Sequence, residues 1–523
     1  MTGTVYGIDL GTTYSCVARV SDVDPDLAEI LRNKDNEFVT PSVIVFDSES
    51  DRVVGRAAKN KSRIKPDHTS ELFKRQMGSE EPTFSAFGTE YYPHELSSMV
   101  LRKLVGDIKD AHGEHVKDVV ITVPAYFGQT QRNATKQAGE LAELNVIGMV
   151  NEPTAAAIAY GASVDDAADP HTVLVYDLGG GTFDVTIVRV DPNAETRYEV
   201  ITSDGNHELG GTDWDDAFVG FVVQQFLEQT PGASDPRFTP MDDQELRNQI
   251  EQAKRALTEA STTEVFVRSG ADLGEVAVTR EQFDEVTRDL LNETINRLRN
   301  ALAAASKKGV DRVDKVLLVG GSSKMPRVAS RLRDELGLEP EMREPDLAVA
   351  KGAALYGEML RDMPVPPDPS GHRLEGDGDG PVRDVCPKGF GLAVIHGQTD
   401  KEIIDFIVSK DDALPAREER EYETRMDDQR TVTSALYEQV GSVQSEQPEN
   451  NEKIIDFAIV DVPPGYRAGT QLDVTFMMDA SGLIRIMAKH PGKEEPLVVE
   501  VNVGGAGPSI EESRDKLEGI LVR

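Results

Sequence analysis

The chain has 523 residues, of which 39% are hydrophobic and 28% are charged, a balance typical of a soluble protein with more than one domain. Its net charge of −36 argues against nucleic-acid binding, because no basic excess is available to meet phosphate backbones. Two cysteines exclude a disulfide framework and a cysteine-based metal site. No apolar run is long enough to cross a bilayer, and no signal-peptide pattern is visible. We therefore expect a cytoplasmic protein with no membrane partner.

Strand-like and helix-like segments alternate over the first 361 residues, which predicts an α/β domain. Buried strands are predicted at 5–8, 119–124, 173–176 and 316–319. Helical patterns cover 129–144, 153–160, 242–261 and 281–306, and another helix begins near residue 326. We assign residues 1–361 to this domain.

The composition changes after the α/β domain. Proline, glycine and aspartate dominate the next stretch, and we assign 362–386 to an interdomain linker. Beyond it the helical pattern disappears and β-forming segments alternate with turns, which predicts an antiparallel β-sandwich over 387–503. The remaining residues, 504–523, form a short tail in which 509–523 can make one amphipathic helix. The predicted fold is an α/β domain, an all-β sandwich and a short helical tail.

Two glycine-rich turns carry the strongest chemical signal. Each follows a buried strand that ends in aspartate, the first over residues 9–13 and the second over 177–184. Glycine brings bare N–H groups against an anion, threonine adds a hydroxyl donor, and aspartate can hold a hydrated divalent cation. Turn capping is the alternative role for the aspartates. Two such turns in similar contexts predict a pair of lobes that grip one polyphosphate.

Other candidate residues are weaker when taken alone. Glu152 lies where a strand gives way to a helix, a position from which it can orient a water, hold a metal shell or cap the helix. Four polar residues between 251 and 258 share one helical face, for which a solvated stripe is the simpler interpretation. Glycine pairs at 210–211 and 320–321 permit close backbone approach to a ribose or phosphate. The sequence contains neither a P-loop nor a dinucleotide-binding fingerprint.

Together these motifs resemble the 70-kilodalton heat-shock chaperone family, within the actin and hexokinase ATPase superfamily. The matching strings are GIDLGTTYSCV at 7–17, VITVPAYF at 120–127, NEPTAAAIAYG at 151–161, YDLGGGTFD at 176–184, LGG at 209–211 and LVGGS at 318–322. Their order and spacing cover the whole first domain. The resemblance implies a two-lobed, actin-like domain that hydrolyses ATP slowly to ADP with Mg²⁺ and K⁺.

The resemblance also implies roles for individual residues. The implied catalytic residues are Lys74, Glu152, Asp177 and Thr182, and Lys74 matches the lysine that reaches the γ-phosphate and the attacking water. The carboxylates around Mg²⁺ and K⁺ are Asp9, Asp177 and Asp184. The implied nucleotide contacts are Gly11, Thr12, Thr13, Tyr14, Gly179, Gly180, Gly181, Thr182, Gly210, Gly211, Glu251, Lys254, Arg255, Thr258, Gly320, Gly321, Ser322, Lys324 and Asp346. Thr258 stands where the family usually has Ser. Lys324 replaces a usual Arg, which weakens stacking on adenine.

The second domain is a weaker match to the same family. Residues 462–469 and 472–482 are similar to its β-sandwich substrate domain. The implied peptide pocket is formed by Leu392, Ile395, Tyr422 and Val432, for which core packing is the alternative. We therefore expect an ATP-dependent chaperone for unfolded or extended polypeptides, with a J-domain co-chaperone and a nucleotide-exchange factor as partners.

Three departures from the family pattern bear on this expectation. The linker at 382–387 is poor in leucine, so fewer apolar side chains can dock on the ATPase domain and couple the domains. Arg425 stands where a small residue arching over the pocket is expected, which alters or blocks the groove. The sequence ends at Arg523, which indicates a lidless or truncated member and fast peptide release. The alternative is a nucleotide-gated regulatory protein with one specific partner; a small-molecule kinase of the same superfamily is a more distant third.

Overall fold

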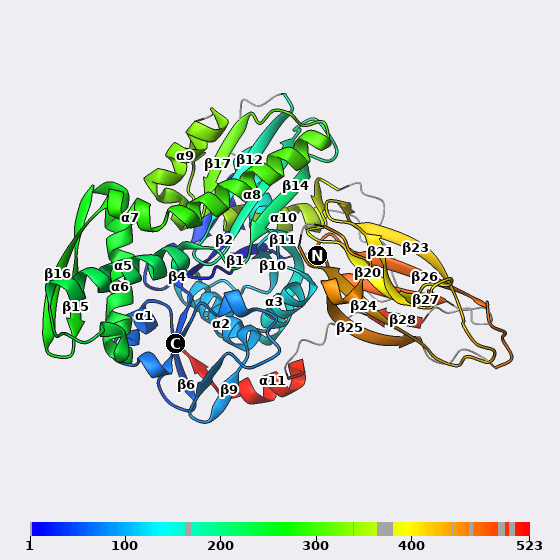
Figure 1. The fold of residues 1–523 in the computed structure, drawn as a ribbon, viewed down its shortest axis with the longest axis horizontal. Coiled ribbons are helices and arrows are strands. Elements are labelled where there is room, and N and C mark those ends of the chain that lie inside the picture. Colours follow the sequence, from blue (N-terminus) through cyan, green and yellow to red (C-terminus); the bar gives the residue numbers. More distant parts are fainter. Residues whose placement is uncertain are drawn as a thin grey trace.

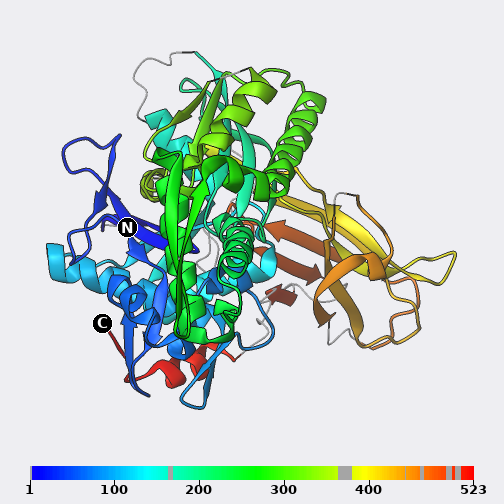
Figure 2. The same ribbon diagram turned by 60° about the vertical axis from the view of Figure 1, so that its left-hand side comes forward.

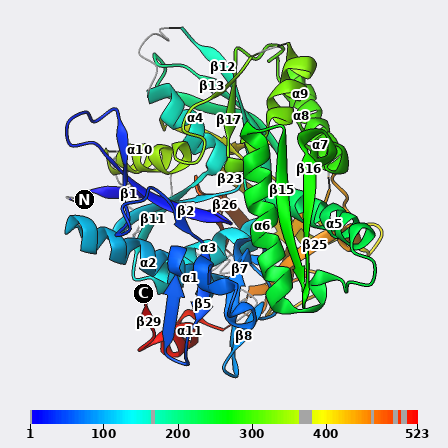
Figure 3. The same cartoon turned by 90° about the vertical axis from the view of Figure 1, so that its left-hand side faces the viewer.

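The computed structural model describes residues 3–162, 169–337, 339–362, 380–441, 443–459, 464–489, 497–500 and 508–523. A large α/β part with two lobes carries a β-sandwich at its side (Figures 1 and 2). A short helix and strand near the C-terminus lie against the α/β part (Figure 3). The predicted fold class, with its α/β domain, β-sandwich and short C-terminal helix, is confirmed.

The first lobe is built on a mixed sheet whose central hairpin contains the first glycine-rich turn. Its strand order is β11-β10-β1-β2-β3, with β4 also paired to β2. Strand β1 runs parallel to β10 and antiparallel to β2, and helices α2 and α3 pack against the sheet. The elements are β1 (Val5–Asp9), β2 (Tyr14–Val20), β3 (Ala28–Leu31), β4 (Thr40–Pro41), β10 (Asp118–Val123), β11 (Asn145–Asn151), α2 (Pro93–His112) and α3 (Gln129–Leu141).

A smaller sheet extends the first lobe. Its strand order is β29-β6-β5-β7, and a short helical turn, η2, follows β7 and carries Lys74. The elements are β5 (Val43–Phe46), β6 (Asp51–Val54), α1 (Arg56–Ser62), η1 (Pro66–His68), β7 (Thr69–Glu71), η2 (Phe73–Gln76), β8 (Phe84–Ala86), β9 (Thr89–Tyr91) and β29 (Leu521–Val522).

The second lobe repeats the arrangement of the first. In its sheet, of order β18-β17-β12-β13-β14-β19-β22, strand β12 runs parallel to β17 and antiparallel to β13. The two glycine-rich turns therefore occupy equivalent places in two sheets. The strands are β12 (His171–Leu178), β13 (Phe183–Val190), β14 (Tyr198–Asn206), β17 (Lys315–Val319), β18 (Pro340–Met342), β19 (Val382–Val385) and β22 (Ala413–Leu414). Around them lie α5 (Gly211–Gln229), η3 (Pro236–Phe238), α6 (Pro240–Glu259), β15 (Thr262–Ser269), β16 (Asp272–Thr279), α7 (Arg280–Val286), α8 (Arg288–Lys307), η4 (Gly321–Lys324) and α9 (Pro326–Leu336).

Two helices, α4 (Glu152–Ala162) and α10 (Ala348–Asp362), join the lobes at the base. They cross so closely that a Cβ atom on Gly352 would lie 1.7 Å from the carbonyl oxygen of Ala155. A Cβ atom on Gly7 of β1 would likewise lie 2.2 Å from the backbone nitrogen of Ala354. Glycine is therefore required at both positions, and the packing sets the spacing between the two sheets.

The β-sandwich consists of two antiparallel four-stranded sheets, of order β21-β20-β24-β25 and β23-β26-β27-β28. Apolar side chains from both sheets meet in one core that includes Phe390, Leu436 and Phe476. The elements are β20 (Phe390–Ile395), β21 (Glu402–Val408), β23 (Ala416–Glu423), β24 (Val432–Gln439), η5 (Pro448–Asn450), β25 (Asn451–Ile459), β26 (Gln471–Met478), β27 (Ile484–Lys489) and β28 (Leu497–Glu500).

The end of the segment assigned to the linker is ordered as strand β19. It pairs in parallel with β14 at the edge of the second lobe's sheet, and antiparallel with β22. The buried carboxylate of Asp384 accepts hydrogen bonds from Asn151 at 2.9 Å and from Thr154 at 3.0 Å. Backbone pairing and a buried carboxylate thus hold this segment. The proline-rich and glycine-rich stretch at 363–379 lies outside the described residues.

A second contact joins the sandwich to the first lobe. Glu438 of β24 is buried, accepts a hydrogen bond from the backbone N–H of Gln129 at 3.2 Å, and pairs with Lys388. Gln129 is the first residue of α3, and Gly128 before it has no side chain with which to cap the helix. A Cβ atom on Gly128 would lie 2.4 Å from the Glu438 carboxylate. A carboxylate of one domain therefore caps a helix of the other.

The C-terminal segment returns to the first lobe. Ser509 caps helix α11 (Ile510–Leu517), the helix expected in the tail, and Leu517 at its end lies in the core of the first lobe. Strand β29 then pairs in parallel with β6 (Figure 3). Both ends of the sandwich are thereby attached to the α/β part.

Candidate functional site

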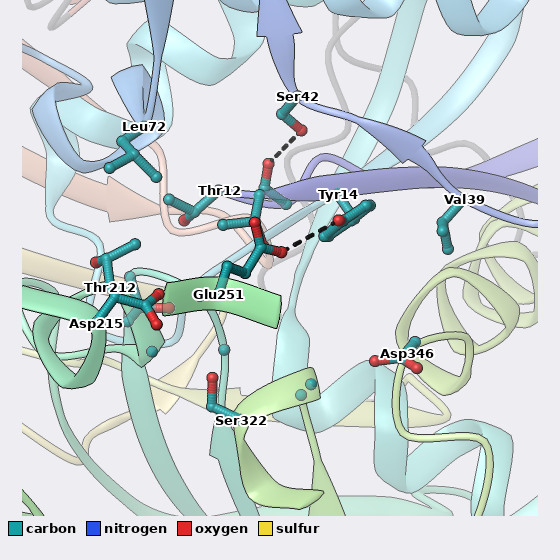
Figure 4. A pocket seen from close by; sticks show the side chains of 18 of the residues that line it. Thr12, Tyr14, Val39, Ser42, Leu72, Thr212, Asp215, Glu251, Ser322 and Asp346 are labelled. Atoms are coloured by element: carbon teal, nitrogen blue, oxygen red, sulfur yellow. Dashed lines mark hydrogen bonds between the residues drawn. The ribbon is translucent and has the colours of Figure 1, made fainter. Parts of the chain in front are cut away.

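A cavity of 390 Å³ opens between the two lobes. Both glycine-rich turns, one face of α6 and the turn η4 line it, and Figure 4 shows several of the side chains that point into it. The predicted site residues that line the cavity are Asp9, Gly11, Thr12, Thr13, Tyr14, Lys74, Glu152, Asp177, Gly179, Gly180, Thr182, Gly211, Glu251, Lys254, Arg255, Thr258, Gly320, Gly321, Ser322, Lys324 and Asp346.

Three predicted residues lie just behind this lining. A Cβ atom on Gly210 would lie 2.4 Å from the backbone nitrogen of Gly181, so these two glycines pack backbone to backbone. Asp184 is buried at the start of β13, where its Cα pairs with that of Asp177 in the ladder to β12. Gly181 and Asp184 belong to the second turn itself, and Gly210 packs against it.

The two glycine-rich turns face each other across the cavity. A Cβ atom on Gly180 would lie 2.5 Å from the hydroxyl of Thr13, and one on Gly181 would lie 2.6 Å from the methyl group of Thr12. The hydroxyl of Ser42 donates to the carbonyl of Gly11 at 2.8 Å and supports the first turn. Only glycine permits this approach, which leaves backbone and threonine donors from both lobes around one space.

Lys74 and Glu152 form a buried ion pair beside the turns. The ammonium nitrogen lies 2.5 Å from a carboxylate oxygen, and the two residues are 3% and 8% exposed. The turn that carries Lys74 begins after Leu72, which has a left-handed backbone conformation with φ of 60°. Glu152 is the first residue of α4, so its position at the helix start is compatible with both interpretations of the sequence. The structure adds an ion pair that the sequence does not reveal.

Three aspartates lie close enough to this pair to be affected by its charges. Burial, followed by the charge of Glu152, raises the pKa of Asp9 to about 7 and that of Asp184 to about 8. The pKa of Asp177 is raised well above its ordinary range for the same reasons. One oxygen of Asp184 is buried without a hydrogen-bond partner among the described residues. These anions are unfavourable in an empty site and suit a bound cation.

The carboxylates do not form a direct ligand cage. In the described part of the chain, no three His, Cys, Asp or Glu side chains converge closely enough to hold a metal ion. Mg²⁺ keeps several of its waters in proteins, and a few separated carboxylates suffice to hold the hydrated ion. The donor set therefore fits a hydrated cation and does not fit a dehydrated one.

The face of α6 closes the cavity on the other side. The carboxylate of Glu251 accepts hydrogen bonds from Lys59 at 2.5 Å and from Tyr14 at 3.3 Å, both from the first lobe. The bond from Tyr14 is drawn in Figure 4. Lys254 pairs with Asp215 at 2.7 Å and donates to the carbonyl of Gly211 at 2.8 Å. The four predicted residues between 251 and 258 line the cavity and are not merely a solvated stripe.

Sequence reasoning missed several cavity residues, among them Lys59, Glu71 and Asp215. Asp215 follows the glycine pair by one helical turn, so its place on the Gly211 side of α5 is a signal that the sequence contains. Burial raises the pKa of both carboxylates, Glu71 and Asp215. Lys59 and Glu71 carry no local signal, because their role depends on how closely the lobes approach.

The predicted peptide residues lie in the sandwich, away from this cavity. Leu392 is 2% exposed in the sandwich core, and Tyr422 and Val432 pack against the same core. Ile395, at the end of β20, is 37% exposed. Arg425 pairs with Asp400, which joins two loops of the sandwich. A peptide role for these residues stays a prediction.

Comparison with known proteins identifies relatives along almost the whole chain. The family model described as "Hsp70 protein" matches residues 5–518. The chain is also similar to the "Chaperone protein DnaK" of Halobacterium salinarum strains R1 and NRC-1, with 36% identity over 525 residues in each case. These alignments cover 98% of this chain and 78% of each relative. Among the helices that the structure describes, none is both long and apolar enough for a membrane span.

Proposed function

Because the chain belongs to the Hsp70 family, whose members bind ATP or ADP, we propose that it hydrolyses ATP to ADP and thereby regulates its binding of extended polypeptides. The observation that carries the proposal is one cavity in which Lys74, Glu152 and two facing glycine-rich turns converge above buried aspartates. This arrangement brings together hydrogen-bond donors for phosphate, the buried ammonium of Lys74 and several carboxylates. A phosphoryl-transfer site requires all three.

The phosphates would lie between the two glycine-rich turns. Backbone N–H groups and the hydroxyls of Thr12, Thr13 and Thr182 are the available donors there. Tyr14, Lys254 and Arg255 line the side of the cavity that would receive the nucleoside, opposite Lys324 and Asp346. Asp9, Asp177 and Asp184 would hold hydrated Mg²⁺ and K⁺. When bound, Mg²⁺ would neutralise phosphate charge.

Lys74 and Glu152 would act on the reacting end. Lys74 is held by one carboxylate in a dry environment, so its ammonium is well placed to stabilise charge that develops at the γ-phosphate. Glu152 would keep Lys74 aligned and orient the attacking water. Thr182 and Asp177 complete the catalytic group at the second turn.

A chain of hydrogen bonds connects the sandwich to the cleft and supports the proposed regulation. Arg132 of α3 donates to the carbonyl of Ser481 in the sandwich at 3.0 Å and to Asn151 at 2.7 Å. Asn151 in turn binds Asp384 and directly precedes Glu152 in sequence. A nucleotide-dependent movement of Glu152 would therefore be transmitted to the sandwich through Asn151 and Arg132. Leu392, Ile395, Tyr422 and Val432 are the proposed peptide contacts, with a J-domain co-chaperone and an exchange factor as proposed partners.

ATPase measurements test the proposal. Hydrolysis would be followed with Mg²⁺ and K⁺, with and without a short apolar extended peptide, in the wild type, in Lys74→Ala and in Lys61→Ala as a matched control. We expect slow turnover that the peptide accelerates, loss of turnover with retained ATP binding in Lys74→Ala, and normal turnover in Lys61→Ala. No hydrolysis by the wild type would overturn the proposal.

One observation favours a second candidate function. Leu392 is buried in the core, Arg425 is paired with Asp400, and of the four proposed peptide contacts only Ile395 is exposed. This arrangement suits a nucleotide-gated protein with one specific partner. A panel of unrelated apolar peptides separates the two functions: a chaperone binds many of them weakly, and the partner-specific protein binds none.

A further inference from the structure

Arg75, the residue after Lys74, crosses from the first lobe to the second. One guanidinium nitrogen donates to the hydroxyl of Thr212 at 2.8 Å. The other donates to the carbonyl of Glu208 at 2.5 Å and to the carboxylate of Asp213 at 3.2 Å. All three acceptors lie between residues 208 and 213, where the chain enters α5: Glu208 precedes the helix, and Thr212 and Asp213 are in its first turn. A single side chain therefore joins the turn that carries Lys74 to three groups of the opposite lobe.

The segment that Arg75 holds supports the second glycine-rich turn. Asp213 accepts a hydrogen bond from the backbone N–H of Gly210 at 2.7 Å. The N–H groups of Gly211 and Thr212 donate to the carbonyls of Gly179 and Gly180, each at 2.9 Å. The backbone at 208–213 is thus bonded directly to the proposed phosphate-binding turn.

The stem of Arg75 also touches that turn. A Cβ atom on Gly181 would lie 2.9 Å from the Cγ atom of Arg75. The aliphatic part of the Arg75 side chain therefore lies along the second turn, and its guanidinium binds residues 208–213, which support that turn. Since Lys74 is its neighbour in a short helical turn, the position of Lys74 relative to the second turn depends on these contacts.

We propose that Arg75 is a positioning residue, which sets Lys74 against the phosphate-binding turn of the opposite lobe when the cleft is closed. This inference rests on the proposed ATP hydrolysis and adds the residue that aligns its two halves. The planar guanidinium donates hydrogen bonds to a hydroxyl, a carbonyl and a carboxylate at fixed angles. A lysine ammonium cannot reproduce this geometry.

Another arginine that bridges the lobes offers a matched control. Arg63 of the first lobe lies 3.5 Å from Glu245 of α6, so it also crosses between the lobes. Its side chain is 52% exposed, whereas that of Arg75 is 20% exposed. Exposed ion pairs of this kind contribute little to the free energy of folding. Arg63→Ala removes an inter-lobe ion pair without disturbing the Lys74 turn.

The test measures single-turnover ATP hydrolysis and ATP affinity in the wild type, Arg75→Ala, Arg75→Lys and Arg63→Ala. We expect Arg75→Ala to lower the hydrolysis rate constant about 30-fold while the ATP dissociation constant changes less than about threefold. Arg75→Lys should recover little of the loss, and Arg63→Ala should behave as the wild type. Millimolar guanidinium ion should partly restore Arg75→Ala and leave Lys74→Ala inactive.

Two further measurements separate positioning from misfolding. The fluorescence of Trp214, the only tryptophan of the chain, reports the start of α5 one residue beyond Asp213. An unchanged spectrum and melting temperature show that the variant is folded. In the milder variant Thr212→Val, which removes one acceptor, we expect a smaller loss, and combining it with Arg75→Ala should add nothing further.

Several outcomes would overturn the inference. They are an unchanged hydrolysis rate in Arg75→Ala, an equal loss of rate and of ATP affinity, and full additivity with Thr212→Val. Failure of the proposed function has a different signature, because the wild type itself would then not hydrolyse ATP. Normal wild-type turnover with an unaffected Arg75→Ala therefore rejects the positioning role alone.

Discussion

The ammonium of Lys516, close to the C-terminal end, lies 2.6 Å from the carboxylate of Glu95, which is fully buried at the start of α2 in the first lobe. The two residues are 421 positions apart in sequence. Beside them, Leu517 completes the first lobe's core, and β29 adds a strand to the edge of β6. The C-terminal segment is therefore an integral part of the first lobe's packing.

Replacing Leu517 with Ala should destabilise the first lobe. The side chain is 1% exposed, and truncating a buried leucine costs about 2–4 kcal/mol through lost burial and a residual cavity. We expect faster hydrogen exchange of the amides in α2 and β6, measured by mass spectrometry. Leu521→Ala serves as the control, because that leucine is 56% exposed. Equal protection of α2 and β6 in Leu517→Ala and in the wild type would contradict this assignment.

Reversing the charge of Glu438 should separate the sandwich from the first lobe. Glu438→Lys would place an ammonium beside Lys388 and at the positive N-terminal end of α3, where the carboxylate now accepts the Gln129 N–H. We expect a larger radius of gyration in small-angle X-ray scattering. Glu418→Lys, at an exposed position on β23, should leave the radius unchanged. A compact Glu438→Lys protein would show that this contact does not hold the domains together.

The metal-free protein should become more stable when Asp184 is replaced with Asn. Burial raises the pKa of Asp184 to about 8, so the folded protein retains a proton that the unfolded chain releases above about pH 4. Wild-type stability therefore falls as the pH rises through this window and levels off above pH 8 or so. Asn does not titrate, so the advantage of Asp184→Asn should grow between these limits, to about 2–4 °C in melting temperature.

Thermal melts in EDTA across this pH range check the effect, and added Mg²⁺ with ATP supplies the control. Mg²⁺ with ATP should stabilise the wild type more than Asp184→Asn, because the variant lacks the anion proposed to hold the cation. A melting-temperature difference independent of pH would show that Asp184 does not titrate as described.

Removing Lys59 should speed nucleotide release. Its ammonium bonds to both Glu251 and Tyr14 and so joins the lobes at the mouth of the cavity. The pair is only partly exposed, and its loss should raise the ADP dissociation rate roughly threefold to tenfold. Stopped-flow release of a fluorescent ADP analogue measures the rate. Lys61→Ala is the control, since Lys61 pairs with Asp47 within the first lobe. If Lys59→Ala released the ADP analogue at the wild-type rate, contacts other than Lys59–Glu251 would hold the lobes together over the nucleotide.

The sequence alone determined the parts of this protein that depend on local chemistry. Two buried strands that carry Asp9 or Asp177 at or next to their ends and then turn on glycine predicted a pair of phosphate-binding turns, and in the structure both turns lie in equivalent hairpins. The alternation of helices and strands, and its disappearance after residue 380, likewise followed from periodicity and composition.

Only the tertiary structure decided which distant groups meet. The ion pair of Lys74 with Glu152, the reach of Arg75 to Thr212 and the cap that Glu438 provides for α3 each join segments that carry no signal of one another. The same holds for Lys516 and Glu95. Such contacts depend on how far apart the packed lobes lie and on which sheet edges remain open to a further strand. The residue pattern of one segment specifies neither the spacing of the lobes nor the open edges.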